Sequence, residues 1–421
     1  MAREMKNSGV KWIGEIPRGW KLVKVKYVSN IASGTTPASN IEDYWDGEIR
    51  WITPADFKTS EKWIKTGRRN ITEKGRQASH LTIFPTSSVI FSKRAPIGQV
   101  GITTEKLCIN QGCLGCITNE IISPTILYYL LSVFTEQFEL LGSGTTFKEI
   151  SATKFASFSI PLPPFSEQKT IADFLDKKCA EIDGLLADLE AEVKTLAEYK
   201  KSIIAETVTR GLNPNAPMKQ SGIPWAETIP AHWDIQKGKY TFRLLQRPVK
   251  EDDGVITCFR DGEVTLRSNR REDGFTMSAK EYGYQGIEPG DLVVHGMDGF
   301  AGSIGISDSR GKGTPVLNVL DSKYNKRYLM YYLRNMAYGD VFLALSTGIR
   351  VRSCDLGWKK LGEIRIVLPP IEEQEKIADY IDHKLDEIQN AIVNKTQQIE
   401  TLKAYKSSLI YEYVTGKKQV I

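Results

Sequence analysis

Histidine and cysteine are scarce in this chain of 421 residues, and their scarcity limits the chemistry that the chain can carry. There are four histidines and six cysteines. Four histidines leave few candidates for a general base. Six cysteines are too few for a disulfide scaffold of this length, which fits a reducing compartment. His295 follows an apolar run, and we interpret it as a core or contact residue and not as a catalyst.

Long apolar segments are absent too. The sequence has no run of eighteen apolar residues, and its first residues are not followed by the apolar core of a secretory signal. With 41% hydrophobic and 25% charged residues, the composition is typical of a soluble globular protein. We expect a cytoplasmic protein without a membrane partner, and the length favours two domains or more.

Sequence motifs of several enzyme classes are incomplete. LPPF at 162–165 differs in its first residue from the (Asn/Asp)-Pro-Pro-(Tyr/Phe) motif of amino-methyltransferases, and leucine cannot accept hydrogen bonds from a target amine. GISDSRGKG at 305–313 has one residue too many between its glycines for a phosphate-binding loop, and it ends in Gly where Ser or Thr would hold magnesium. Cys113 and Cys116, with Cys108 nearby, lack a second ligand pair at zinc-finger spacing. We therefore expect neither catalysis nor a metal site in this chain.

An internal repeat is the main feature that is present. Residues 162–176 read LPPFSEQKTIADFLD, and residues 368–382, 206 positions later, read LPPIEEQEKIADYID. The same offset aligns LAEYKKSIIAETVT (196–209) with LKAYKSSLIYEYVT (402–415). Upstream, MKNSGVKWIGEIPRGW (5–20) is echoed by MKQSGIPWAETIPAHW (218–233). The chain therefore consists of two tandem half-molecules.

Both repeated segments have the heptad spacing of a coiled-coil seam. Neither has an internal proline, paired prolines precede each helix start, and Gly211 provides a stop for the first. Each predicted helix has about 44 residues and a length of roughly 66 Å. Lysines interrupt the seam at Lys200, Lys395 and Lys406. The predicted seam residues are Leu175, Cys179, Ile182, Leu186, Leu189, Val193, Leu196 and Ile203, and then Ile381, Leu385, Ile388, Ile392, Ile399, Leu402 and Leu409.

A single amphipathic helix of this length cannot bury its own apolar stripe. Two coiled coils with separate partners are one solution, because heptads do not identify their mate. We favour the alternative, in which the two stripes bury each other as an antiparallel pair with one globular block at each end.

The net charge of the chain alternates along its length. Residues 1–164 hold 20 Lys and Arg against 14 Asp and Glu, and residues 165–210 hold 7 against 10. Residues 211–370 hold 22 against 18, and residues 371–421 hold 7 against 9. We therefore divide the chain into a basic domain (1–164), a long helix (165–210), a second basic domain that begins with a linker at 211–224 (211–370) and a second long helix (371–421). A polyanion is expected to bind the basic domains.

Both basic domains are predicted to be mixed α/β structures. Strand patterns occur at 88–93 and 102–117 in the first and at 291–296 and 303–307 in the second. Short apolar helices are predicted at 125–134 and 327–337. The two domains thus share a plan but not a sequence.

Taken together, these features resemble the specificity subunit of type I restriction-modification systems, over essentially the whole chain. The doubled LPP-containing helix starts carry the resemblance, together with four phrases: SGTTPASNIEDYWDGEIRWITPADF (33–57), FSKRAPIGQVGI (91–102), MDGFAGSIGI (297–306) and STGIRVRSCDLGWKKLGEIRIVLPP (346–370). The second domain departs from the pattern, because VITCFRDGEVT (255–265) stands where an equivalent of residues 45–56 would fall.

The resemblance implies a fold and a function. The fold would be two tandem α/β (α+β) target-recognition domains separated by two long helices that form an antiparallel coiled coil, with a pseudo-two-fold internal repeat. Each domain would read one half of a split, asymmetric site in double-stranded DNA, and the helix pair would set the spacing. The helices would also dock two methylation subunits, which methylate adenine N6 with S-adenosylmethionine, and restriction subunits would add ATP- and Mg²⁺-dependent translocation and cleavage. The chain itself would bind no cofactor and would not be an enzyme.

Candidates for DNA contact follow from residue type, because Arg, Lys, Asn and Gln read base edges and phosphate contacts set the register. In the first domain they are Lys58, Lys62, Lys65, Arg68, Arg69, Lys93, Arg94, Thr145, Thr146 and Lys148. In the second they are Arg260, Arg267, Arg270, Arg271, Met297, Asp298, Arg350 and Arg352. We favour Lys93, Arg94, Arg350 and Arg352, because nearby Gly or Pro indicates loops that can approach a backbone. For each basic residue, a solvated surface position is an equal alternative.

The repeated acidic residues of the long helices have two interpretations. They form either a partner surface or a solvated face, since exposed charges at these positions are ordinary. The residues concerned are Glu167, Glu181, Glu198, Glu206, Glu373, Glu387 and Glu412.

Two other classes of protein fit the sequence less well than a specificity subunit. A stand-alone DNA methyltransferase would need a methyl-donor site, and no glycine-rich loop of that kind follows a predicted strand. A coiled-coil scaffold without a DNA role would leave the basic domains unexplained. The specificity-subunit reading accounts for both observations.

Overall fold

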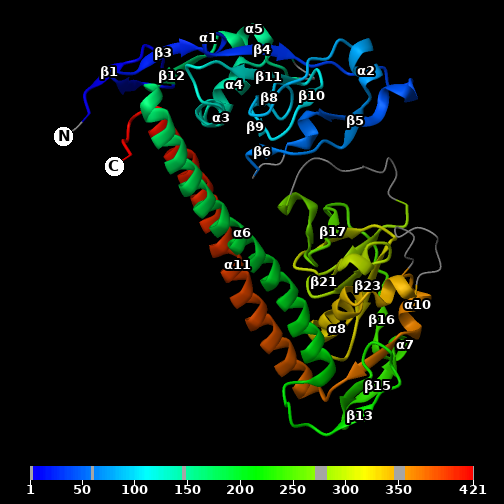
Figure 1. Ribbon diagram of the computed structural model, residues 1–421. Helices are drawn as coiled ribbons and strands as arrows, with labels where there is room; N and C mark the ends of the chain where they lie inside the picture. Colours follow the sequence, from blue (N-terminus) through cyan, green and yellow to red (C-terminus); the bar gives the residue numbers. More distant parts are fainter. Residues whose placement is uncertain (1–2, 58–60, 145–147, 271–281, 346–355, 421) are drawn as a thin grey trace. The chain divides into compact units, whose positions relative to one another are not determined.

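The computed structural model describes residues 3–57, 61–144, 148–270, 282–345 and 356–420. Its contacts divide the chain into two units. The first comprises Met1–Glu190 with Gln397–Ile421, and the second comprises Ala191–Thr396. Each unit therefore holds one α/β domain together with one part of each long helix (Figure 1). Across the described residues, no helix is both long and apolar enough to cross a membrane.

Two long helices, α6 (Phe165–Arg210) and α11 (Ile371–Val414), pack together and join the domains. In the first unit, Phe174 stacks on Tyr413 and Asp183 binds Lys406. In the second unit, Glu192 binds Lys395 and Lys200 binds Gln389. The partner position in α11 falls as the position in α6 rises, so the helices are antiparallel. Both helices are followed by a glycine with positive φ, Gly211 and Gly416, as is common at helix C-termini.

Every predicted seam residue is buried or partly buried. The fully buried ones lie mainly toward the helix ends, where the α/β domains add further cover: Leu175, Cys179, Ile182, Ile203, Ile381, Ile388, Ile399 and Leu409. The partly buried ones are Leu186, Leu189, Val193, Leu196, Leu385, Ile392 and Leu402.

The first domain is built around a five-stranded sheet in the order β4-β11-β8-β9-β6. A second sheet of three strands has the order β10-β5-β7, and its strands alternate along the sequence with those of the first sheet. The strands are β1 (Met5–Asn7), β2 (Glu15–Pro17), β3 (Lys21–Lys24), β4 (Ser29–Ser33), β5 (Trp45–Ile52), β6 (Trp63–Ile64), β7 (Arg69–Ile71), β8 (Val89–Ser92), β9 (Val100–Thr103), β10 (Leu107–Ile109), β11 (Cys113–Thr118) and β12 (Ser159–Leu162). The helices are α1 (Val25–Val28), α2 (Glu73–Ala78), α3 (Pro124–Val133), α4 (Thr135–Leu141) and α5 (Ala152–Ala156).

The second domain contains a four-stranded antiparallel sheet in the order β16-β23-β20-β21. Its strands are β13 (Met218–Gln220), β14 (Thr228–Pro230), β15 (Asp234–Lys237), β16 (Arg243–Leu244), β17 (Ile256–Cys258), β18 (Val264–Leu266), β19 (Gln285–Ile287), β20 (Leu292–His295), β21 (Ile304–Ile306), β22 (Gly311–Gly313), β23 (Leu317–Asp321) and β24 (Arg365–Leu368). Its helices are α7 (Gly238–Thr241), α8 (Lys326–Tyr338), α9 (Val341–Ala344) and α10 (Trp358–Glu363).

The two domains share one topology despite their unlike sequences. The order β4-β11-β8-β9 of the first sheet corresponds to β16-β23-β20-β21 of the second. The turn between β8 and β9 is therefore topologically equivalent to the turn between β20 and β21. The domains differ where the sequence indicated, because β5 is the middle strand of its sheet, whereas residues 255–265 form the β17–β18 hairpin.

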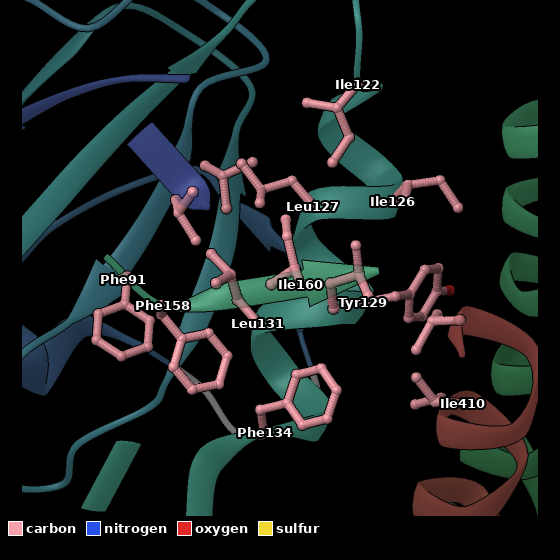
Figure 2. Close-up of a cluster of buried hydrophobic side chains, with 14 of the residues drawn as sticks. Phe91, Ile122, Ile126, Leu127, Tyr129, Leu131, Phe134, Phe158, Ile160 and Ile410 are labelled. Carbon is pink, nitrogen blue, oxygen red and sulfur yellow. The ribbon is translucent and has the colours of Figure 1, made fainter. Parts of the chain in front are cut away.

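An apolar core joins each domain to the long helices. Figure 2 shows the core of the first unit, in which residues of α3 such as Leu127 and Leu131 pack with Phe91, with Ile160 of β12 and with Ile410 of α11. In the second unit, residues of α8 pack with Ile204 and Val208 of α6 and with Ile377 of α11. The predicted fold class, tandem α/β domains on an antiparallel helix pair, is confirmed, as are the strands and short helices predicted in each domain.

Candidate nucleic-acid interface

The loop after β8 brings Lys93 and Arg94 together with the segment that contains Lys148. The Glu149 carboxylate forms ion pairs with both side chains, and its oxygens lie 2.9 Å from Lys93 Nζ and 2.8 Å from Arg94 Nε. An isolated β-bridge between Arg94 and Glu149 and a bond from the Ile150 N–H to the Lys93 carbonyl (3.0 Å) hold the two segments side by side. The Lys93 side chain is only 13% exposed, whereas Arg94 is 44% exposed.

Glu149 holds these two loops together, and this role was not predicted from the sequence. Its partial burial raises the pKa of the carboxyl, but hydrogen bonds and charge from Lys93 and Arg94 outweigh that effect and lower it below its usual value. Glu149 therefore stays ionised near neutral pH. The only sequence signal for it was its position next to Lys148.

The predicted residues between β5 and β7 divide into two groups. Arg68 is 77% exposed, and its guanidinium donates to the Ala55 carbonyl at 3.2 Å. The Arg69 guanidinium stacks on the Trp45 ring at 4.0 Å, and Lys65 is exposed as well. Lys62 is different, because its side chain is 13% exposed and its ammonium binds Asp176 of α6 at 2.6 Å. Lys62 thus faces the long helix and not the open surface.

In the second domain, the turn after β20 carries two of the predicted residues. Asp298 accepts a hydrogen bond from Arg260 at 2.8 Å, and the Met297 side chain is exposed. The backbone N–H groups of Met297 and Asp298 both donate to His295 Nδ1, at 3.2 and 3.0 Å. Because burial lowers the pKa of His295, its neutral form accepts these bonds and fixes the turn. The structure thus gives His295 the contact role that was predicted for it.

Arg267 and Arg270 lie beside the β17–β18 hairpin. Arg267 Nε donates to the Thr257 hydroxyl at 3.3 Å. Arg270 binds Asp261 at 2.8 Å and Glu263 at 3.2 Å, and its guanidinium lies 4.1 Å from the centre of the Phe259 ring. These contacts connect both arginines to the β17–β18 hairpin, whose antiparallel pairing corresponds to that of β5 with β7 in the first domain.

Six of the predicted contact residues lie outside the described residues. They are Lys58, Thr145, Thr146, Arg271, Arg350 and Arg352.

The cysteines and the glycine-containing segment 305–313 are parts of the fold and do not form a metal or phosphate site of the kinds considered above. Cys108, Cys113 and Cys116 are buried, and burial raises the pKa of the Cys108 thiol to about 11 and that of Cys116 to about 12. In the described ranges, no three His, Cys, Asp or Glu side chains are grouped so that they could hold a metal ion. The segment 305–313 ends in strand β22 and not in a helix N-terminus, and its Arg310 binds Asp253 at 2.9 Å.

The acidic helix residues are mostly paired. Lys178–Glu181 and Lys384–Glu387, both 2.7 Å, are exposed pairs that occupy equivalent positions of the repeat. Glu198 binds Lys201 and Glu412 binds Lys418. At the helix starts, Glu167 accepts from Arg3 and from Trp20 Nε1, and Glu373 lies 2.8 Å from His232.

Comparison with known proteins agrees with this architecture. Residues 17–195 match the family model of the type I restriction modification DNA specificity domain. The MjaIX specificity subunit of Methanocaldococcus jannaschii is 27% identical, over 97% of this chain and 95% of that protein.

Solved structures share the fold. One solved chain comes from a structure that addresses complex assembly and conformational transition of the type I restriction-modification system. It has a TM-score of 0.71 at 16% identity, over 95% of this chain and 98% of that one. The HsdS subunit from Thermoanaerobacter tengcongensis has a TM-score of 0.51 at 16% identity, over 96% and 98%.

Two unlike α/β domains on a duplicated, antiparallel helix pair define a class of DNA-recognition subunits. The chain belongs to the DNA specificity subunits of type I restriction-modification systems. Subunits of this kind are the non-catalytic, sequence-recognising members of their complexes.

Proposed function

We propose that each α/β domain reads one half of a split, asymmetric site in double-stranded DNA and that the helix pair sets the distance between the halves. The observation that carries this proposal is the combination of a repeated frame with unlike domains. The helices α6 and α11 have similar sequences at a constant offset of 206. The two α/β domains, in contrast, share a strand order but have different loops. Unlike readers on a repeated frame suit two different half-sites.

The DNA-reading loops are proposed to be the equivalent turns after β8 and β20, with neighbouring exposed cations. In the first domain the set is Arg68, Arg69, Arg94 and Lys148, and in the second it is Arg260, Arg270, Met297 and Asp298. Arg68 (77% exposed) and Arg260 (61% exposed) have the most accessible guanidinium groups among the ion-paired members. Lys62 and Lys93, each 13% exposed, are proposed to support these loops from behind.

The long helices are proposed to dock two methylation subunits. Support comes from the exposed pairs Lys178–Glu181 and Lys384–Glu387, which recur at the repeat offset and so offer one charge pattern twice. Two copies of one partner need two equivalent surfaces. These partners would methylate adenine N6 with S-adenosylmethionine, and restriction subunits would join them with ATP and Mg²⁺. Because its target is DNA, the complex would work in the cytoplasm.

The proposal is tested by expressing the chain with its cognate methylation subunits and mapping N6-methyladenine across a genome. The expected result is one split motif whose two halves differ in sequence and whose gap is constant. A continuous motif, or two identical halves, would contradict the assignment of one half to each domain.

A further inference from the structure

Helix α3 of the first domain is fixed to the start of α6 at its N-terminus. The N–H of Ser123, the N-cap residue of α3, donates to Gln168 Oε1 at 2.8 Å. The Gln168 amide in turn donates to the carbonyls of Ile121 at 2.8 Å and Pro163 at 3.1 Å. The glutamine is 1% exposed, so all its polar groups are satisfied inside the protein.

A second contact lies further along the same two helices. The hydroxyl of Tyr129, in α3, donates to Asp176 Oδ1 of α6 at 2.6 Å, and Tyr129 is 3% exposed. Gln168 and Asp176 are eight residues apart, or about 12 Å along the helix axis. Two polar contacts at this separation add to the apolar packing of α3 and fix its direction on α6.

The second unit repeats both contacts. The N–H of Asn325, the N-cap residue of α8, donates to Gln374 Oε1 at 3.0 Å, and the Gln374 amide donates to the Pro369 carbonyl at 2.7 Å. The hydroxyl of Tyr331 donates to Asp382 Oδ1. Gln374 and Asp382 follow Gln168 and Asp176 by the repeat offset of 206. We call each set of two contacts a clamp.

The tyrosines of the two clamps do not coincide when the double tyrosines of the two helices are matched. Matching the Tyr128-Tyr129 pair to Tyr331-Tyr332 would place Tyr129 opposite Tyr332. Counted from their N-caps, however, Tyr129 and Tyr331 are both the sixth residue, and they make the same bond. Two domains of otherwise unlike sequence therefore place a tyrosine hydroxyl at the same point of the long helices.

Each clamp also includes a cation, and the source of this cation differs. In the first unit Lys62, just before β6, binds Asp176 at 2.6 Å. In the second, Arg327 of α8 itself binds Asp382 and, at 2.6 Å, Asp379. The first clamp therefore extends into the segment that carries Arg68 and Arg69.

We propose that the two clamps position the reading domains on the helix pair and so determine which spacer length the protein accepts. The positioning residues are Gln168, Tyr129 and Asp176 in the first clamp and Gln374, Tyr331 and Asp382 in the second. This inference rests on the proposed function. A reading surface about 20 Å from a clamp, a distance typical of such a domain, moves by about 3.5 Å for a rotation of about 10°. That displacement is close to the rise of one base pair along DNA.

The test uses the full chain in complex with its methylation subunits and DNA duplexes that carry the mapped half-sites at the native spacing and at one base pair less or more. The measured quantity is the ratio of methylation rates on native and altered spacers. Tyr129→Phe combined with Tyr331→Phe is expected to lower this ratio by about tenfold, because it removes one hydrogen bond to a charged acceptor from each clamp. The bases preferred in each half should not change.

Tyr128→Phe is the matched control, because the Tyr128 ring also lies near Lys62, with Nζ 5.7 Å from the ring centre, while the hydroxyl bound to Asp176 is that of Tyr129. Its ratio should equal that of the unmodified chain. Both rates come from one preparation, so any loss of folded protein cancels, and competition binding of the same duplexes provides the ratio if turnover is slow.

Unchanged ratios in the double tyrosine variant and in Gln168→Leu combined with Gln374→Leu would overturn the clamp while leaving the split-site function standing. If the unmodified complex shows no spacer preference, the proposed function itself is overturned, and the role of the clamps is overturned with it.

Discussion

At the scale of single residues, most of the proposed DNA contacts are already paired within the protein. Arg94 is bound to Glu149, Arg260 to Asp298 and Arg270 to Asp261. Binding to a phosphate or a base edge would exchange one partner for another, so the pairs hold each guanidinium in place before DNA arrives. The same carboxylates repel DNA phosphates at other positions, which favours selective over general binding.

Replacing Arg260 tests one of these contacts. Arg260→Ala is expected to weaken binding of the complex to its target by about tenfold, or roughly 1.4 kcal/mol, as for the loss of one base or phosphate contact. If the residue reads a base, discrimination should relax in only one half of the site. Competition binding with singly substituted duplexes measures both effects.

Arg243→Ala is the matched control for Arg260→Ala. Arg243 is 73% exposed and binds Asp321 at 2.7 Å, so it forms a similar surface pair, but on strand β16 and not in the proposed reading loops. Equal losses of affinity in the two variants would argue against a specific role for Arg260.

His295 provides a test that depends on pH. Its burial lowers its pKa below the usual 6.5. Because the unfolded chain then binds the proton more tightly, folding stability should be unaffected above about pH 6.5 and should fall as the pH drops below that value. With only four histidines in the chain, proton NMR titration, with assignment by His295→Gln, can follow each ring. A pKa at or above 6.5 for His295 would contradict the role of its neutral ring in holding the turn.

At the scale of structural elements, the heptad spacing predicted the two long helices well, because an apolar stripe of that length has to be buried. It did not predict what the interrupting lysines do. Lys406 binds Asp183 at 2.6 Å, Lys395 binds Glu192, and Lys200 donates to Gln389 at 3.0 Å. Each breaks the apolar seam but has a polar partner across it, which favours one register over shifted ones.

The coupling between Lys406 and Asp183 can be measured by a double-mutant cycle of Ala substitutions in urea unfolding. We expect a coupling free energy of about 1 kcal/mol, since both side chains are partly buried. The exposed pair Lys403–Glu400 on the same helix is the control, with an expected coupling of about 0.3 kcal/mol. A Lys406–Asp183 value no larger than the control would mean that this pair does not fix the register.

The sequence predicted a shared plan for the two domains, with a short apolar helix in each, but it did not predict which loops are equivalent. The turns after β8 and β20 differ in sequence, since one reads KRAPIG and the other GMDGFAG, although both lead into a Gly-x-(Val/Ile)-Gly-Ile segment at 98–102 and 302–306. The shared strand order places both turns at the same point of the sheet. The match between Tyr129 and Tyr331 becomes clear only when the two helices are counted from their N-caps, Ser123 and Asn325. Contacts across distant segments, such as Lys62 with Asp176, have no local pattern at all.

At the scale of the whole molecule, the proposed function assigns reading to the α/β domains and positioning to the repeated helices. The second domain enters through β15 and leaves through β24, which pair with each other in one antiparallel ladder. Both connections to the helices therefore lie side by side, and a domain can be exchanged at that point with little change to the frame.

Exchanging residues 234–368 for the corresponding domain of a related specificity subunit should change one half of the methylated motif and leave the other half unaltered. The reason is that the first unit, including the end of α11, keeps its own core. Sequencing of N6-methyladenine sites reads both halves at once. A change in both halves would show that the domains do not read independently.

The central claim, that the antiparallel helix pair sets the distance between two unlike half-sites, is tested most directly by shortening both helices. Deleting residues 187–193 of α6 together with residues 395–401 of α11 removes one heptad from each. The removed length is about 10.5 Å, or about three base pairs of DNA. Methylation mapping with the shortened chain should show the same two half-sites with a gap reduced by about three base pairs. An unchanged gap, or altered bases in either half, would contradict the account.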